Sequence, residues 1–179
     1  FDQHFNAVCA DAACAVFKRL FSSSNEMDWW VENVFPAKYH IPMCYDWGRM
    51  IIGFHGMASG SGGTNPDETT THSCFQEEAA LTAGGKLNQN SMCLGDDGVL
   101  TYPGINVDHV LETYQRHGQV MNVTKQHVSR DDAVFLRRWH HQNYREQGIC
   151  RGVYSTCRAL GKLKYMERFH EDWDKEAVI

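Results

Sequence analysis

Two adjacent acids in a Gly-Asp-Asp-Gly sequence are the residues of this chain best suited to chemistry. Asp96 and Asp97 lie within Asn90–Tyr102, where apolar residues flank a turn on both sides, and this pattern predicts a β-hairpin. Neighbouring carboxylates repel each other, and a bound divalent cation would offset this repulsion. Cation binding is therefore one physical reason for two acids at the same turn. Mg²⁺ prefers such oxygens and shares its coordination shell with substrate phosphates. An ordinary hairpin turn explains the same residues, and both interpretations stay open here.

Length and composition indicate a globular chain. It has 179 residues, of which 42% are hydrophobic, enough for one cored domain or a piece of a larger one. No apolar run approaches the roughly 20 residues of a membrane span, and the start shows no signal-peptide pattern. Because the first residue is Phe1 and not Met, we expect the chain to be cut from something longer. Seven cysteines without a Cys-x-x-Cys pair favour a reducing compartment over a disulfide framework.

Charge is distributed unevenly along the sequence. Residues 1–115 carry a net charge of −9, residues 116–168 carry +7 and residues 169–179 carry −3. A basic segment beside an acidic one suits a protein that holds both metal ions and a polyanion. A solvated charged surface is the alternative explanation.

Apolar periodicity and turn-forming residues predict an α+β layout, with helices on one face of an antiparallel sheet. We expect Thr64 or Asn65 to cap the helix that precedes the Asp96 hairpin, with Pro66 in its first turn. The predicted elements are a helix over 5–21, a mixed aromatic segment over 27–50, a loop over 53–63, a helix over 64–83, the hairpin, a helix from 107 that ends before 118, a turn and strand over 120–128, strands over 133–144 and 149–155, and a basic helix over 156–169.

The aromatic residues of the mixed segment have two possible roles. They are Trp29, Trp30, Tyr39, Tyr45 and Trp47. We expect them to belong to a core more often than to a surface on which bases stack.

Five segments in the same order resemble the palm motifs of viral RNA-dependent RNA polymerases. They are Phe1–Phe5 (the second half of the first motif), Ser59–Thr64 (the second), Asn90–Tyr102 (the third), Arg116–Lys125 (the fourth) and Phe135–Arg138 (the fifth, a primer-grip hairpin). The amino-acid sequences of 61–69, 93–98 and 137–141 are similar to those of picobirnavirus polymerases. These enzymes belong to viruses with segmented double-stranded RNA genomes.

The resemblance implies a polymerase palm in which an antiparallel sheet packs on helices. It assigns residues 1–24 to the palm, 25–56 to part of the fingers, 57–155 to the palm again and 156–179 to the start of the thumb. The implied activity is template-directed transfer of nucleotides from NTPs to an RNA 3′-hydroxyl. We expect the 179-residue chain alone to be inactive.

The same resemblance assigns catalytic roles to the paired acids. Asp96 would bind the catalytic Mg²⁺, with Mn²⁺ as a possible substitute, and Asp97 would be a weaker ligand or electrostatic partner. A further metal-binding aspartate is implied five residues before Asp2, ahead of Phe1. Lys125 would protonate the pyrophosphate leaving group, and its alternative is an exposed lysine without a catalytic role.

Nucleotide binding is implied for residues of the first two motifs. Asp2 would recognise the ribose 2′-hydroxyl, and its alternative role is to cap the following helix. Ser59 and Gly60 resemble a flexible loop that contacts ribose and template, where glycine permits close backbone approach. Thr64 and Asn65 lie where this loop meets the helix.

The second motif departs from the commoner family pattern at one position. Many relatives place an asparagine nine residues after the loop serine, as the partner of the Asp2 position, whereas this chain has Glu68 there. Asn65 either takes over the ribose contact or serves only as a helix cap, and the sequence leaves both possibilities open.

Arg137 and Arg138 are the expected RNA-binding residues. If 135–139 is a continuous strand, the two side chains alternate between its faces, so that one reaches a primer phosphate. Histidine and cysteine spacings match no structural zinc site.

The expected partners are an RNA template, a primer or product strand and NTPs, with viral capsid protein as a further candidate and no membrane. The expected location is the virion interior and the host cytoplasm. Two other functions compete with this one: a reverse-transcriptase-like palm, and a non-enzymatic RNA-binding α+β module that uses the basic segment 116–168.

Overall fold

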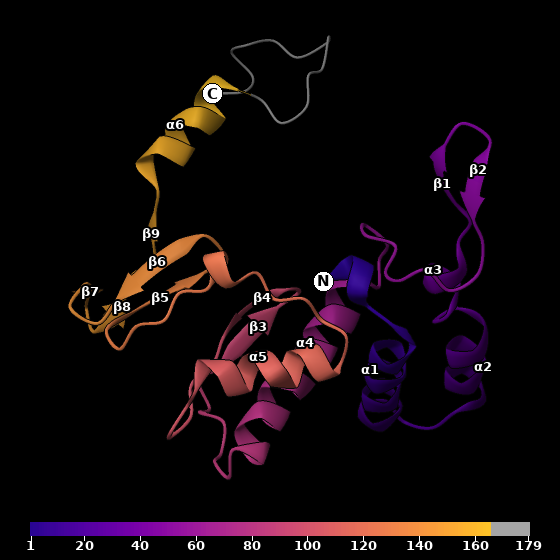
Figure 1. Ribbon diagram of the computed structural model, residues 1–179, viewed down its shortest axis with the longest axis horizontal. Coiled ribbons are helices and arrows are strands. Elements are labelled where there is room, and N and C mark those ends of the chain that lie inside the picture. The colour runs from indigo at the N-terminus through magenta and orange to yellow at the C-terminus, as the bar shows by residue number, and fades with distance from the viewer. Residues whose placement is uncertain (166–179) are drawn as a thin grey trace. The chain divides into compact units, whose positions relative to one another are not determined.

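The computed structural model describes residues 1–165, which form two compact units, residues 1–125 and the described residues from 126 onward. Figure 1 shows their elements. The first unit contains η1 (Asp2–His4), α1 (Ala7–Leu20), α2 (Asn25–Asn33), α3 (Ala37–His40), β1 (Met43–Asp46), β2 (Arg49–Ile51), α4 (Thr64–Thr82), β3 (Met92–Leu94), β4 (Asp97–Val99), α5 (Val107–Arg116) and η2 (Val123–Lys125). The second contains β5 (Asp132–Phe135), β6 (Arg138–His141), β7 (Arg145–Glu146), β8 (Ile149–Cys150), β9 (Val153–Tyr154) and α6 (Thr156–Lys164).

Helix α1 forms where apolar periodicity predicts it, and a side chain outside the helix fixes its start. Asn6 caps the helix by accepting a hydrogen bond from the Cys9 N–H. The same amide donates to the carbonyl of His117, just beyond α5, at 2.8 Å. One residue therefore begins α1 and ties it to the end of α5.

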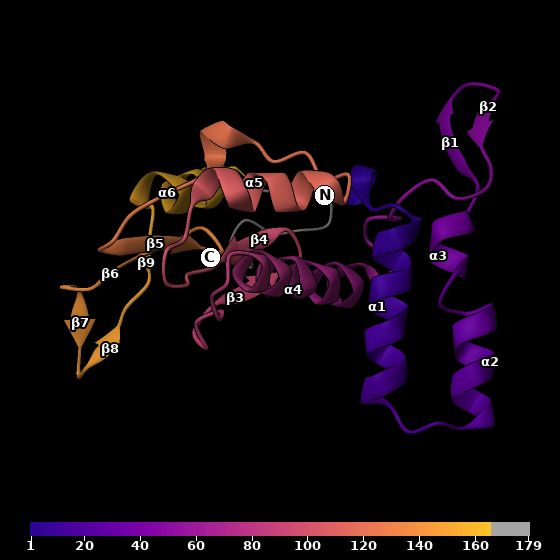
Figure 2. The same ribbon diagram turned by 60° about the horizontal axis from the view of Figure 1, so that its bottom comes forward.

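Helix α4 is the central element of the first unit. It contacts α1, α5 and β3, so it is covered on several sides (Figure 2). Buried polar groups on such a helix need partners. Thr71 donates to the carbonyl of Cys9 at 3.0 Å, and Asp67 forms a buried ion pair with Lys38 at 2.8 Å. The hydroxyl of Tyr39 also donates to Asp67.

The start of α4 differs from the prediction. Gly63 is its N-cap, and no side chain caps the first turn, so neither Thr64 nor Asn65 is the cap. The Thr64 hydroxyl instead donates backwards to the carbonyl of Ala58 at 3.0 Å. This bond directs the Thr64 side chain toward the loop.

The core of the first unit joins α1, α3, α4 and α5 around aromatic rings. Phe5 stacks on Tyr39 with ring centroids 5.8 Å apart, and Phe75 stacks on His117 at 4.6 Å. The buried apolar residues of the described chain are Phe5, Cys9, Ala10, Ala13, Phe35, Tyr39, Met57, Phe75, Ala79, Ala80, Tyr102, Val110 and Tyr114.

The aromatic segment predicted over 27–50 is mixed, since it spans parts of α2, α3 and the β1–β2 hairpin. Helix α2 lies alongside α1, and the β1–β2 hairpin extends away from α3 in both ribbon views (Figures 1 and 2). Tyr39 is a core residue and Trp30 packs against the core, as expected. Trp29, Tyr45 and Trp47 are exposed, so the core prediction is wrong for these three.

The strand predicted within 120–128 is absent from this described stretch, which contains only η2. Asn122 accepts hydrogen bonds from both the N–H and the hydroxyl of Thr124, at 3.0 and 2.7 Å. Local bonds of this kind turn the backbone and compete with strand pairing.

In the second unit, the single strand predicted over 133–144 is a hairpin. Strands β5 and β6 pair antiparallel, and β9 pairs with the other edge of β6. Leu136 and Arg137 form the turn with φ of +49° and +61°. Paired positive φ values usually call for Asn-Gly, so Leu-Arg carried no turn signal. Strands β7 and β8 form a second hairpin, so the strand predicted over 149–155 is divided into β8 and β9.

Helix α6 begins at Thr156 as predicted and ends at Lys164, and residues 166–169 of the predicted helix lie outside the described residues. Within residues 1–165, no helix combines the length and apolar character that crossing a bilayer requires.

Candidate active site

The paired acids lie at the tip of a short hairpin, as predicted. Strands β3 and β4 place Leu94 opposite Asp97, so Gly95 and Asp96 form the connecting turn. Gly95 adopts a φ of +58°, which glycine tolerates without steric cost. Both carboxylates are exposed. The turn therefore presents Asp96 to solvent at the end of the hairpin.

A second group of polar side chains gathers from three segments. Asp2 comes from η1, Ser59 from the loop before α4, and Glu68 from the second turn of α4. The Asp2 carboxylate is hydrogen-bonded to the side chains of both Glu68 and Ser59. The structure thus brings together the first and second sequence motifs, which are more than fifty residues apart.

The protonation of this group follows from burial. Glu68 is buried, and desolvation together with the hydrogen bond to Asp2 raises its pKa to about 8. The hydrogen bond from Glu68 and the one from Ser59 keep the pKa of Asp2 below its usual value against the opposing effect of burial. At neutral pH, a protonated Glu68 therefore donates to an ionised Asp2.

Glu68 also links this group to the acidic turn. The negative charge of Asp96 contributes to raising the Glu68 pKa. A Cβ on Gly95 would lie 3.6 Å from Glu68 Oε2. The other oxygen, Oε1, is buried and has no hydrogen-bond partner among the described residues.

Glu68 is the site residue that the sequence did not assign. Its only signal was its spacing of nine residues from Ser59, the position at which the resemblance leads us to expect asparagine. Asn65, the residue considered in its place, is exposed and accepts a hydrogen bond from the Thr69 hydroxyl at 2.8 Å. The contact with Asp2 is made by Glu68, and nucleotide binding by Asn65 stays a prediction.

The loop before α4 is open at its tip and anchored at its base. Ser59 and Gly60 are exposed, and Gly60 has a φ of +88°. The Met57 N–H donates to the backbone carbonyl of Asp2 at 3.1 Å. Thr64 hydrogen-bonds to Ser61 at 3.0 Å. An exposed tip between anchored ends suits a loop that closes on a ligand.

The three basic residues predicted for the site are all exposed. Lys125 lies in η2, and its ammonium group has no ion-pair partner within the described chain. Arg137 and Arg138 belong to the second unit. Arg137 is in the β5–β6 turn, and the Arg138 guanidinium lies 5.6 Å from the ring centroid of Tyr154. Since Arg137 is a turn residue, the predicted alternation of the two arginines along one strand is wrong.

The donor set fits a hard divalent cation in part. Asp96 and Asp97 supply carboxylate oxygens, which Mg²⁺ prefers. Among residues 1–165, no three His, Cys, Asp or Glu side chains are grouped so as to hold a metal ion by themselves. The two acids fit as part of a coordination shell that substrate phosphates and other ligands complete.

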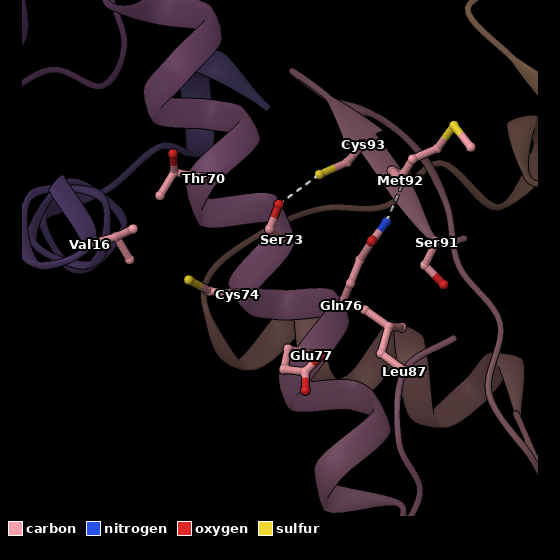
Figure 3. A pocket seen from close by; sticks show the side chains of 10 residues that line it. All are labelled: Val16, Thr70, Ser73, Cys74, Gln76, Glu77, Leu87, Ser91, Met92 and Cys93. Atoms are coloured by element: carbon pink, nitrogen blue, oxygen red, sulfur yellow. Dashed lines mark hydrogen bonds between the residues drawn. The ribbon is translucent and has the colours of Figure 1, made fainter. Parts of the chain in front are cut away.

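A pocket of about 480 Å³ lies elsewhere in the first unit, between α1, α4 and β3 (Figure 3). Its lining includes Val16, Thr70, Cys74 and Leu87 and contains none of the site residues described above. It is therefore separate from the candidate active site.

Comparisons with known proteins agree with the site. No family model matches the chain. The chain is 52% identical over 180 residues to a "Potential RNA-dependent RNA polymerase" of Human picobirnavirus (strain Human/Thailand/Hy005102/-), covering 99% of this chain and 34% of that protein.

Two crystal structures show the same fold. The RNA-dependent RNA polymerase of a human picobirnavirus matches with a TM-score of 0.92, and its insertion-loop deletion mutant with 0.93, each at 52% identity. The match covers 99% of this chain and 34% and 35% of the two crystallised chains, so this chain spans about a third of its relatives' length. In sequence and in its α+β fold, this chain is similar to about a third of each of these RNA-dependent RNA polymerases.

Proposed function

We propose that this chain serves as the palm region of a viral RNA-dependent RNA polymerase and joins nucleotides from NTPs to an RNA 3′-hydroxyl. The observation that carries the proposal is the grouping of Asp2, Ser59 and Glu68 beside the Gly95–Asp96 turn. In this proposal, residues 1–24 and 57–155 are palm, 25–56 are part of the fingers and 156–179 begin the thumb.

Each residue contributes a distinct task. Asp96 and Asp97 would hold Mg²⁺ or Mn²⁺ together with substrate phosphates, and such an ion would supply a lower pKa for the attacking hydroxyl and positive charge against the phosphates. Asp2 accepts a hydrogen bond from the ribose 2′-hydroxyl. Ser59 and Gly60 close on the nucleotide, and Thr64 holds the loop at its base. Asn65 is a further nucleotide contact.

The basic residues act on phosphates. Lys125 donates a proton to the pyrophosphate leaving group, and Arg137 and Arg138 hold the primer backbone without reading its sequence. RNA template, primer and NTPs are the partners, with viral capsid protein as a further partner. The virion interior and the host cytoplasm are the proposed locations.

The test uses a chimaera in which this chain replaces the matching third of the human picobirnavirus polymerase. We expect Mg²⁺-dependent primer extension with ribonucleotides. Asp96→Asn should lower the extension rate by at least about a hundredfold and leave RNA affinity unchanged. The isolated chain, as a control, should not extend a primer. Full activity of Asp96→Asn would contradict the proposal, and a preference for deoxyribonucleotides would favour a reverse transcriptase.

A further inference from the structure

Both peptide groups of Gly95 are held by side chains of α4. The Gly95 N–H donates to Thr69 Oγ1 at 2.9 Å, and the Gly95 carbonyl accepts from His72 Nδ1 at 2.9 Å. Gly95 directly precedes Asp96, so its carbonyl belongs to the peptide bond from which Asp96 continues. Thr69 and His72 are three residues apart and share one helix face. A single turn of α4 therefore holds the hairpin by hydrogen bonds to Gly95, the residue next to the proposed metal ligand Asp96.

The Thr69 hydroxyl is oriented by a second bond. It donates to Asn65 Oδ1 at 2.8 Å, which leaves its lone pairs for the Gly95 N–H. Asn65 thus has a structural partner, at the end of α4 that joins the Ser-Gly loop. The hydrogen-bond chain runs from this end of the helix to the acidic turn.

The His72 ring is held in place by its surroundings. It is buried, and its centroid lies 5.7 Å from that of Phe1 and 5.5 Å from that of Tyr114. A Cβ on Gly98 would approach His72 Cε1 to 2.7 Å, so strand β4 packs directly on the ring. Because a carbonyl oxygen only accepts hydrogen bonds, Nδ1 carries the proton toward Gly95. Burial lowers the pKa of His72, which favours this neutral form.

The hairpin needs such support. Strands β3 and β4 have three residues each and pair only with one another among the described strands. An isolated two-stranded hairpin is marginally stable in water. Further bonds from α4 hold β3: Ser73 Oγ lies 3.0 Å from Cys93 Sγ, and Gln76 donates to the Met92 carbonyl at 3.4 Å.

We propose that Thr69 and His72 are positioning residues for RNA synthesis: through Gly95, they hold the Asp96 carboxylate in its metal-binding orientation. The inference rests on the proposed function and adds two residues to it. Neither side chain touches the reacting groups. Their effect is that the turn does not reorganise when substrate and metal bind, and misplacement of a catalytic group by about 1 Å can reduce rates about a hundredfold.

Hydrogen exchange of the Gly95 amide in the 179-residue chain tests whether the Thr69 hydroxyl holds Gly95, and this test does not depend on activity. Thr69→Val removes the acceptor at nearly constant volume, and we expect Gly95 exchange to accelerate about five- to tenfold. Thr69→Ser should restore the wild-type rate. Thr70→Val is the matched control, since Thr70 neighbours Thr69 on α4 and has no hydrogen bond from its side chain among the described residues; it should leave the rate unchanged.

The polymerase chimaera tests the consequence for catalysis. Thr69→Val should raise the Mg²⁺ concentration for half-maximal activity at least about threefold and lower kcat about tenfold, with RNA affinity unchanged and with rescue by Thr69→Ser. His72→Asn, which retains a donor, should be less impaired than His72→Leu.

Two results would overturn the inference: Gly95 exchange in Thr69→Val equal to wild type, or faster exchange with unaltered Mg²⁺ dependence and kcat. A wild-type chimaera that makes no RNA would instead refute the proposed function. The exchange data would still show separately whether Thr69 holds the Gly95 amide.

Discussion

The carboxyl group of Glu68 is hydrogen-bonded to the carboxylate of Asp2, so that two acids from segments far apart in sequence share one proton. This arrangement replaces the acid–amide pair that the family pattern would place there. A protonated carboxyl can donate as an amide does, but it loses this ability when it ionises. The pair therefore makes the site sensitive to pH in a way that asparagine would not.

The first prediction concerns stability against pH. Folding raises the Glu68 pKa from 4.5 to about 8, so the folded chain holds a proton that the unfolded chain lacks between these values. The free energy of unfolding should therefore fall as pH rises through this window, by at most about 1.4 kcal/mol per pH unit. Asp2 and Asp96 favour the proton on Glu68, and the amino-terminal ammonium opposes it.

Urea unfolding between pH 6.5 and 8 measures this slope. Below pH 6.5, buried His72 contributes the opposite slope, because folding lowers its pKa. Glu68→Gln keeps a donor toward Asp2 and does not titrate, so its stability should be nearly independent of pH in this range. A wild-type slope retained by Glu68→Gln would show that another group is responsible.

The second prediction concerns the choice of sugar. In the chimaera, Asp2→Ala should reduce the preference for ribonucleotides over deoxyribonucleotides by more than about tenfold, because a 2′-hydroxyl then loses its acceptor. Competing incorporation of NTPs and dNTPs gives the ratio. An unchanged ratio with reduced activity would assign Asp2 a structural role, such as holding the loop through Ser59.

The third prediction concerns the buried ion pair that joins α3 to α4. Lys38→Met leaves Asp67 buried without its cation and should lower the free energy of unfolding by about 3–5 kcal/mol. Arg49→Met is the control, since Arg49 and Asp46 form an exposed pair at 4.0 Å and should contribute less than about 1 kcal/mol. If denaturant unfolding showed that both variants lose the same free energy of unfolding, the predicted effect of burial on the Lys38–Asp67 pair would be wrong.

The fourth prediction concerns glycine in strand β4. Gly98→Ala should displace the hairpin from α4, since the new Cβ would lie 2.7 Å from His72 and 2.8 Å from Gln76. We expect a loss of about 1–3 kcal/mol in stability and faster exchange of hairpin amides. Gly62→Ala, where a Cβ would meet nothing within 4 Å, should be nearly neutral in both measurements.

The fifth prediction concerns phosphate contacts. Replacing either Arg137 or Arg138 with alanine in the chimaera should weaken RNA binding equally for unrelated sequences. The slope of log affinity against log salt should fall by about 1 for each lost contact. A change that depended on RNA sequence would contradict backbone binding.

Local sequence determined the elements that carry the candidate site. Apolar spacing marked α1 and α5 to within a few residues, and the start signals at Thr64 to Pro66 marked α4. Gly-Asp-Asp-Gly between apolar residues marked the hairpin with Asp96 at its tip. These features arise from neighbouring residues, since helix periodicity and turn geometry depend on positions only a few apart. Residue preferences did not mark the Leu136–Arg137 turn, although the resemblance implied a hairpin at Phe135–Arg138, because the pairing of β5 with β6 imposes its backbone.

Only the tertiary structure decided which residues of the site meet. Glu68 is one acid among many in the sequence, and its role follows from burial beside Asp2 and the Gly95 turn. In the same way, Thr69 and His72 are ordinary helix residues until β3 and β4 pack on their face of α4. Contacts between distant segments depend on how elements pack and exclude water, and a linear pattern of residue types does not contain this information.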